Sequence, residues 1–141
     1  MDDRRKILRH FLAALAYRTQ KALRDAPPEF AVFRAARMVR TPHELIRHMD
    51  SVLGYARTYF VGGSYRPPDF ADFHHAVAHF HGVVQDLARH LEEGTELRRI
   101  TPEILLQGPF SDAMTTCRTT GHAAQACWQS GAAGEFYRCR N

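Results

Sequence analysis

Nine histidines give this chain of 141 residues its most evident chemical potential. An imidazole can bind a transition metal or transfer a proton near neutral pH. His75 and His79 are four residues apart in a predicted helix, which is the spacing of two ligands of one metal. Both point away from the apolar stripe of that helix, so a solvated face is the favoured interpretation. His74 and His81 lie at the edge of the stripe, where they either flank the core or line a pocket.

His48 occupies a different kind of position. It follows Leu45 by three residues and precedes Val52 by four, which places it on the margin of a buried helical stripe. A histidine at such a place is more often hydrogen-bonded at the edge of the core than bound to a metal, and a metal site needs further ligands nearby. Asp112 is an acidic residue at a comparable place, in the first turn of the last predicted helix. Its commoner role is a carboxylate that the helix macrodipole stabilises.

Three long amphipathic helices, and a fourth that begins near Gly108, are predicted to position these residues. Apolar residues at steps of three and four predict the long helices over residues 3–23, 42–61 and 70–93, and a short helical turn after residue 101. Thr41, Pro42 and Glu44 have the spacing of a capping box with proline in the first turn. Asp69 is expected to cap the third helix. No alternating strand pattern is present, so the sequence predicts an all-α fold, an antiparallel four-helix bundle.

The composition changes abruptly at Thr116. From that residue to Asn141 there is no Leu, Ile, Val or Met, whereas all three cysteines and the only tryptophan lie in this last part. Such a segment cannot supply an aliphatic helix face, and we therefore expect the last helix to be truncated or irregular. The chain is predicted to comprise a helical bundle, residues 1–115, and an atypical tail, residues 116–141. An odd number of cysteines does not indicate a disulfide framework.

Two segments carry a resemblance to a known family. RTPHELIRHMDSVLGYA in the second predicted helix, followed downstream by LLQGPFSDAMT, resembles the DinB-like (DinB/YfiT-like) superfamily of small four-helix bundles over most of residues 5–115. The resemblance implies a divalent metal held between a histidine of the second helix and two ligands, four residues apart, on the last helix. On this pattern His48 and Asp112 are metal ligands, and the third ligand position is occupied by Thr116.

A shift of reading frame would explain both the tail and the missing ligand. If one extra nucleotide lies near codon 116, reading one base later from Thr116 permits a segment H-V-G-Q-L and then an aliphatic helix. This segment restores the T-H-x-G-Q-L motif that is common in the family, with its histidine at position 116. The hypothesis is that residues 116–141 are the product of such a frameshift, and the nucleotide sequence of the gene tests it.

The resemblance also implies a chemistry. Imidazole and carboxylate ligands suit Zn²⁺, Ni²⁺ or Fe²⁺, and such an ion can activate water or a substrate thiol at neutral pH. A metal-dependent transferase that uses a small-molecule thiol, or a related hydrolase, is therefore expected. A threonine hydroxyl is a weak ligand for these metals. We accordingly expect this copy to be impaired and its metal to be weakly held or absent. The alternative is a non-catalytic helical-bundle interaction protein, and a homodimer is expected in either case.

Charge and hydropathy narrow the other possibilities. The formal net charge is +4, but arginines are spread along the chain and no RNA-binding signature accompanies them, so nucleic-acid binding is disfavoured. The sequence has no apolar run of the roughly 18 residues that a membrane span needs, and its first residues lack a signal-peptide pattern. A cytoplasmic location is the resulting expectation.

Overall fold

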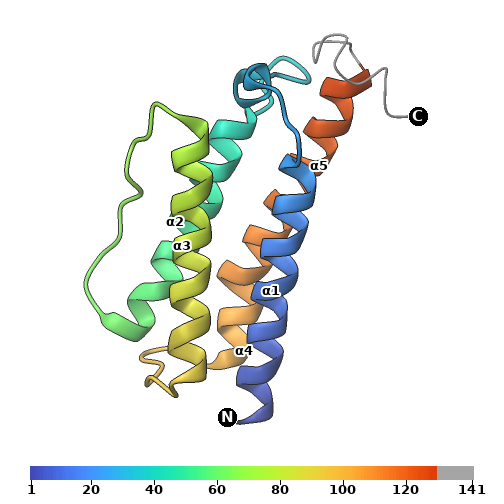
Figure 1. Cartoon of the computed structure of the whole chain (residues 1–141). Helices are drawn as coiled ribbons and strands as arrows, with labels where there is room; N and C mark the ends of the chain where they lie inside the picture. Colours follow the sequence, from blue (N-terminus) through green and yellow to red (C-terminus); the bar gives the residue numbers. More distant parts are fainter. Residues whose placement is uncertain (130–141) are drawn as a thin grey trace.

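The computed structural model describes residues 1–129, and within this range every regular element is helical (Figure 1). Four long helices form the bundle, and the prediction of an all-α four-helix fold is confirmed. No helix in the described part of the chain is long and apolar enough to cross a membrane. The elements are α1 Asp3–Leu23, a 3₁₀ turn η1 Pro28–Val32, α2 Pro42–Val61, α3 Phe73–Glu92, α4 Pro102–Leu105, a π-helical turn η2 Leu106–Phe110, and α5 Ser111–Gln129.

The direction of the helices differs from the predicted antiparallel arrangement. The helices α2 and α3 run parallel, because His43 packs on Phe73 where both begin and Phe60 stacks on His90 where both end. The helix α1 is antiparallel to α3, since the guanidinium of Arg5 donates to backbone carbonyls at the carboxyl end of α3. Figure 1 shows the same order, with α1 and α5 running one way and α2 and α3 the other.

The connection between α2 and α3 accounts for this difference. It comprises the eleven residues 62–72, which reach about 36 Å when extended. A helix of 20 residues is about 30 Å long, so the connection can return along the whole length of the bundle, as Figure 1 shows. Its length and its two prolines were the signal of an extended crossover.

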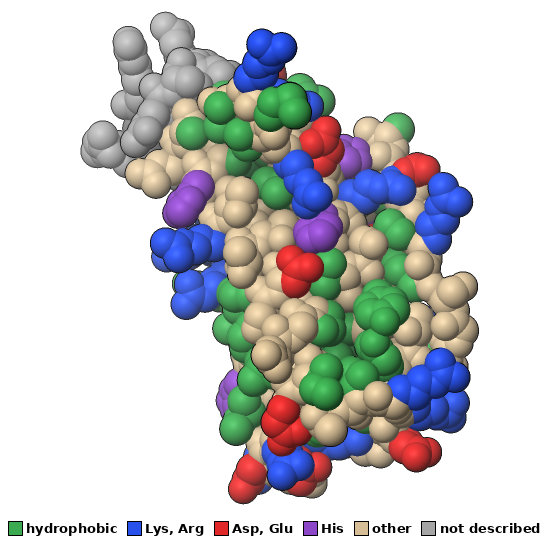
Figure 2. All heavy atoms as spheres, turned by 180° about the vertical axis from the view of Figure 1, so that it is seen from behind, with side chains coloured by type: hydrophobic (Ala, Val, Ile, Leu, Met, Phe, Trp, Pro, Cys, Tyr) green, Lys and Arg blue, Asp and Glu red, His purple; other side chains and the backbone are tan. Residues whose placement is uncertain are grey.

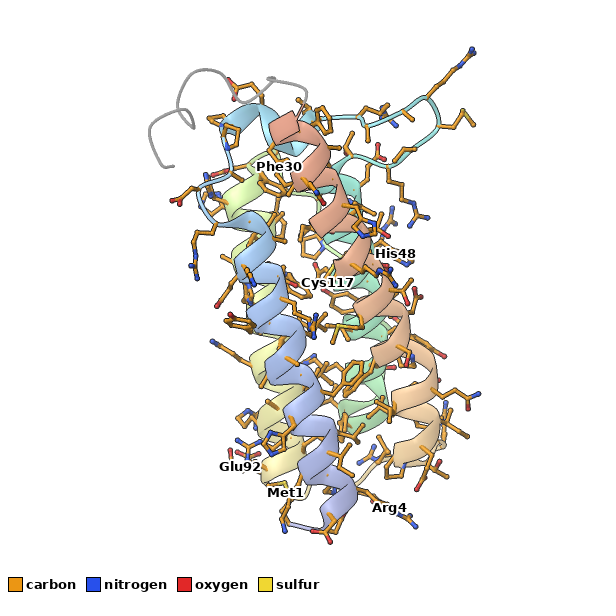
Figure 3. The ribbon with its side chains drawn as sticks, turned by 90° about the vertical axis from the view of Figure 1, so that its right-hand side faces the viewer. Met1, Arg4, Phe30, His48, Glu92 and Cys117 are labelled. Atoms are coloured by element: carbon orange, nitrogen blue, oxygen red, sulfur yellow. The ribbon has the colours of Figure 1, made fainter. Side chains whose placement is uncertain are left out.

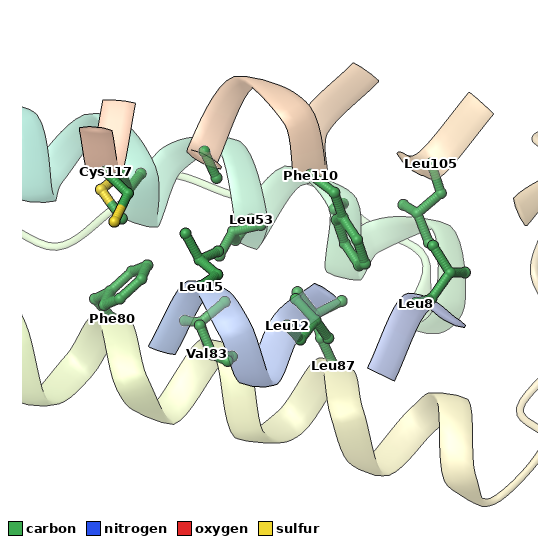
Figure 4. Close-up of a cluster of buried hydrophobic side chains, with 14 of the residues drawn as sticks. Leu8, Leu12, Leu15, Leu53, Phe80, Val83, Leu87, Leu105, Phe110 and Cys117 are labelled. Atoms are coloured by element: carbon green, nitrogen blue, oxygen red, sulfur yellow. The ribbon is translucent and has the colours of Figure 1, made fainter. Parts of the chain in front are cut away.

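Leucines and phenylalanines of α1, α2, α3, α4 and η2 fill the centre of the bundle (Figure 4), to which α5 adds the smaller side chains of Ala113 and Cys117. The fully buried members include Leu12, Leu53, Phe80, Leu87 and Phe110. Burial of each such side chain stabilises the fold by about 1.5–3 kcal/mol. A second, smaller cluster lies at one end, where Phe30 of η1 packs on Ala123, Ala124 and Cys127 of α5. The first part of the connection after α1 thus packs onto the bundle, whereas Val32 and Met38 in the same connection are exposed.

The last helix begins earlier than Gly108. Thr101 caps α4, and the helical backbone then continues through η2 into α5. Pro109 lies inside this run, where it lacks a backbone donor. The π-helical turn accommodates it, and the hydroxyl of Ser111 donates to the carbonyl of Leu106 at 2.6 Å. Successive buried residues are therefore five apart at the turn, from Leu105 to Phe110, and three or four apart afterwards.

The expected truncation near Thr116 is not found, because α5 continues to Gln129. Its buried face after that point consists of small residues at helical spacing, namely Cys117, Thr120, Ala123, Ala124 and Cys127. Small side chains let a helix pack closely without an aliphatic stripe. The buried hydroxyl of Thr120 donates to the carbonyl of Thr116 at 3.1 Å, which satisfies it within the helix. Residues 130–141, the rest of the predicted tail, lie outside the described part of the chain.

Of the two helix caps predicted from the sequence, one is confirmed and one is wrong. The capping box of α2 is present, with Glu44 and Thr41 exchanging side-chain-to-backbone hydrogen bonds. The cap of α3 is Asp72 rather than Asp69, and the helix begins at Phe73. Asp69 instead pairs with Arg47 of α2. This pair helps to hold the crossover connection against the bundle.

Tyr65 is the central contact of the crossover connection. Its ring lies directly over Gly54 of α2, where an added Cβ would stand 2.0 Å from the ring. Its hydroxyl donates to the buried carboxylate of Asp50 at 2.7 Å. Burial, together with the hydrogen bond and the charge of Asp50, raises the pKa of Tyr65, so the phenol stays protonated and keeps its donor role. Because Gly54 has no side chain, the ring of Tyr65 can pack directly against α2 at this position.

We predict that Gly54→Ala destabilises the protein, although alanine favours a helix interior by roughly 1 kcal/mol over glycine. The methyl group displaces Tyr65 and leaves the buried carboxylate without one donor, a loss of about 1–3 kcal/mol. Urea unfolding measures the effect. The same change in a Tyr65→Ala background should become neutral or stabilising, because no ring remains to be displaced. Equal destabilisation in both backgrounds would show that the ring does not cause it.

Candidate functional site

The structure brings His48 and Asp112 together from helices that are distant in sequence. His48 projects from α2 and Asp112 from the first turn of α5, and the His48 Nε2 and Asp112 Oδ1 atoms are 3.4 Å apart. The two side chains are 31% and 51% exposed, so the pair lies at the edge of the contact between the helices rather than in an interior cavity. Figure 3 shows His48 next to α5. The predicted marginal position of His48 is thus what the fold shows.

Thr116 does not complete a ligand set. It lies one helical turn after Asp112 and is buried, but its hydroxyl donates to the backbone carbonyl of Asp112 at 3.0 Å. The hydroxyl is therefore hydrogen-bonded within its own helix. Within residues 1–129 no group of three or more His, Cys, Asp or Glu side chains has a geometry that could hold a metal ion. The described site is a pair, one imidazole and one carboxylate.

The other histidines separate into surface and structural groups. His75 is exposed and pairs with Asp72 of its own helix cap, with 2.9 Å between Nδ1 and Oδ2. His79, four residues later, contacts a different carboxylate, that of Asp50, at 2.9 Å. The two imidazoles thus take separate partners. The solvated face predicted for both is correct for His75 but wrong for His79, because the crossover connection covers that part of α3.

Asp50, Tyr65 and His79 form a polar network that sequence reasoning missed. The carboxylate of Asp50 is nearly inaccessible, and it is satisfied by the phenol of Tyr65 and by Nδ1 of His79. The ring of His79 packs on Phe70 at 5.2 Å between centroids. A carboxylate at Nδ1 orients an imidazole and favours the tautomer with its acceptor at Nε2. The one feature of the sequence that indicated this network is Asp50, a carboxylate that directly follows Met49 of the buried stripe of α2.

The two cysteine thiols within residues 1–129 are poorly placed for nucleophilic chemistry. Cys117 is buried between α1 and α5, as Figure 3 shows. Burial raises its pKa, and the hydroxyl of Thr19, 3.4 Å from the sulfur, offsets this only in part. Burial also raises the pKa of Cys127. A reactive cysteine needs a lowered pKa and access to solvent, so these two thiols act as small core side chains.

Positive and negative side chains are mixed on one face of the described residues. On the face that Figure 2 shows, Lys and Arg side chains alternate with Asp and Glu side chains and do not merge into one basic stripe. Several of the cations pair with carboxylates across helices, as Arg57 does with Asp86 and Arg4 with Glu103. Burial of Asp86 opposes its ionisation, but hydrogen bonds from Arg57 and Arg89 lower its pKa overall.

Comparisons with protein-family models, with curated proteins and with solved structures found no significant match to this chain. The resemblance to the DinB-like superfamily therefore remains a prediction from the two sequence segments that carry it. The site is defined by its geometry, an imidazole and a carboxylate that approach one another across the contact between α2 and α5.

A pH dependence follows from His81, whose pKa is lowered by burial below its ordinary value of about 6.5. The unfolded state binds a proton at His81 below that pH more readily than the folded state does. Stability should therefore fall as pH drops below about 6.5, and His81→Gln should reduce this fall. Urea unfolding at pH 7.5 and pH 5.5 measures it. His75→Gln, at an exposed site on the same helix, is the control, and an equal effect of both changes would contradict the prediction.

Proposed function

We propose that this protein is a DinB-like, divalent-metal-binding helical bundle whose ion is held by His48 of α2 and Asp112 of α5. The observation that carries the proposal is the convergence of these two side chains from positions 64 residues apart in sequence. The resemblance of the surrounding segments to the family assigns the same two positions as ligands. The convergence is a separate geometric observation, and it supports that assignment.

The distance between the two atoms suits a shared ion. A separation of 3.4 Å is long for a hydrogen bond, whose usual N···O distance is about 2.9–3.0 Å. Zn²⁺ binds imidazole nitrogen at about 2.0–2.1 Å and carboxylate oxygen at about 2.0–2.2 Å. In a tetrahedral site the two ligand atoms are then about 3.4 Å apart. The separation of the two atoms therefore matches that of two ligands of one ion of this size, and Ni²⁺ and Fe²⁺ use the same ligand types.

The chemistry proposed for this site is metal-dependent transfer to a thiol, or hydrolysis. A bound ion would lower the pKa of a coordinated water or substrate thiol. His48 and Asp112 would hold the ion, and both side chains are partly exposed, so a small molecule could reach it. Because Thr116 supplies no imidazole, this copy binds its ion weakly and its activity is impaired.

A second candidate function is association without catalysis. In that case the His48–Asp112 contact is an ion pair that joins α2 to α5. The observation that favours this alternative is the exposure of two apolar side chains in the connection between α1 and α2, Val32 at the end of η1 (73% exposed) and Met38 (91% exposed). A homodimer that buries these residues is the form that we propose for it. Absence of metal binding, together with self-association that Met38→Ser weakens, would support this alternative over the metalloprotein.

The metal proposal predicts a gain of function. Thr116→His places a third ligand one turn from Asp112, and it should tighten binding of Zn²⁺ or Ni²⁺ by at least about tenfold, equivalent to 1.4 kcal/mol. Calorimetric titration of the purified variant with each metal measures the change. Circular dichroism on the same sample checks that the buried substitution leaves the helices intact.

Two further variants make the result specific. Thr119→His is the matched control, because Thr119 is also a threonine of α5 that donates to a carbonyl four residues back, but it is exposed. Thr119→His should not tighten metal binding. Adding His48→Ala to Thr116→His should remove the gain. If Thr116→His folds and binds metal no better than the unmodified chain, the proposed ligand geometry is wrong.

A further inference from the structure

A long groove runs between α1 and α5, on the opposite flank of α5 from the His48–Asp112 pair. Its volume is about 1020 Å³, and most of its lining is apolar. Figure 3 looks onto this side of the bundle, with Cys117 in the space between the two helices. Pockets that bind small molecules typically have about 300–1,000 Å³ and a mainly apolar lining with a few polar groups. The groove therefore has the size and the character of a ligand site.

Small side chains of α1 and α5 create the groove. Ala14 and Ala22 of α1 and Gly121 and Ala124 of α5 are among the residues that line it. At Gly121 an added Cβ would meet no atom within 4 Å, so the helices leave open space at this level. The unusual composition of the chain after Thr116 thus has a structural consequence, since leucines at the same positions would fill the space.

The groove has a cationic part and an apolar end. Because α1 and α5 run parallel, their residue numbers increase in the same direction along it. Phe11 and Met114 line the end nearer the start of both helices, whereas Arg18, Lys21 and Arg118 lie further along. No carboxylate lines the groove, and none of these three cations forms an ion pair within residues 1–129.

We propose that this groove binds an anionic amphiphile, specifically a long-chain carboxylate. The head group contacts Arg18, Arg118 and Lys21, and the hydrocarbon chain lies along the apolar lining toward Phe11 and Met114. A second copy of this chain fits less well, because a symmetric contact through the groove would place the same three cations of each copy against one another. The charge of the groove therefore selects a ligand of opposite sign with an apolar tail.

Displacement of a fluorescent fatty acid tests the proposal on the full chain. cis-Parinaric acid should bind saturably, and laurate should displace it. Dodecyltrimethylammonium, which has the same chain length and the opposite charge, should displace it at least about tenfold less effectively. The double variant Arg18→Gln, Arg118→Gln should weaken displacement by laurate and leave that by the cationic amphiphile unchanged.

A pair of glycine variants locates the binding site. Gly121→Leu fills the groove and also improves helix propensity, so it should lower affinity for parinaric acid by at least about tenfold without unfolding the protein. Gly82→Leu is the matched control, because Gly82 also has open space at its Cβ but lies on α3, and it should leave the affinity unchanged. Binding that Gly121→Leu does not weaken would overturn the proposal. Absence of parinaric acid binding, or self-association that Gly121→Leu alone abolishes, would equally overturn it.

Discussion

The path of residues 62–72 is the constraint on which the rest of this fold depends. Because this connection returns along the bundle, α2 and α3 run parallel, and α5 packs between α1 and α2. The same path covers the face of α3 that carries His79 and buries Asp50 beneath Tyr65. The packing of the Tyr65 ring over Gly54 is a local contact that stabilises this path of the connection and, with it, the parallel arrangement of α2 and α3.

The sequence was sufficient to predict the features that depend on residues close together in the chain. The periodicity of α1 and the capping box of α2 predicted both elements at their observed bounds. The sequence was insufficient where segments distant in the chain determine the environment of a side chain. Helical periodicity describes His79 as a surface residue, and only the crossover connection makes it a partner of a buried carboxylate. For the site, sequence reasoning placed His48 and Asp112 correctly in relation to their own helices, and the resemblance paired them.

Helix α5 shows how a helix face without long aliphatic side chains can still pack. Its threonines donate to carbonyls four residues back, so buried hydroxyls such as that of Thr120 carry no unsatisfied donor. The same kind of hydrogen bond holds the hydroxyl of Thr116 on the backbone carbonyl of Asp112. Close packing of α5 and the open space beside α1 both follow from the small residues of this helix.

The π-helical turn at Leu106–Phe110 sets the rotational phase of everything after it. Such a turn contains one residue more than an α-helical turn, and one residue corresponds to about 100° of rotation. Removing a single residue there would leave α5 equally helical but would rotate it by about 100°, so that Asp112 would no longer face His48. A site built on this helix can therefore be gained or lost through a one-codon insertion or deletion, without any substitution of the residues that form it.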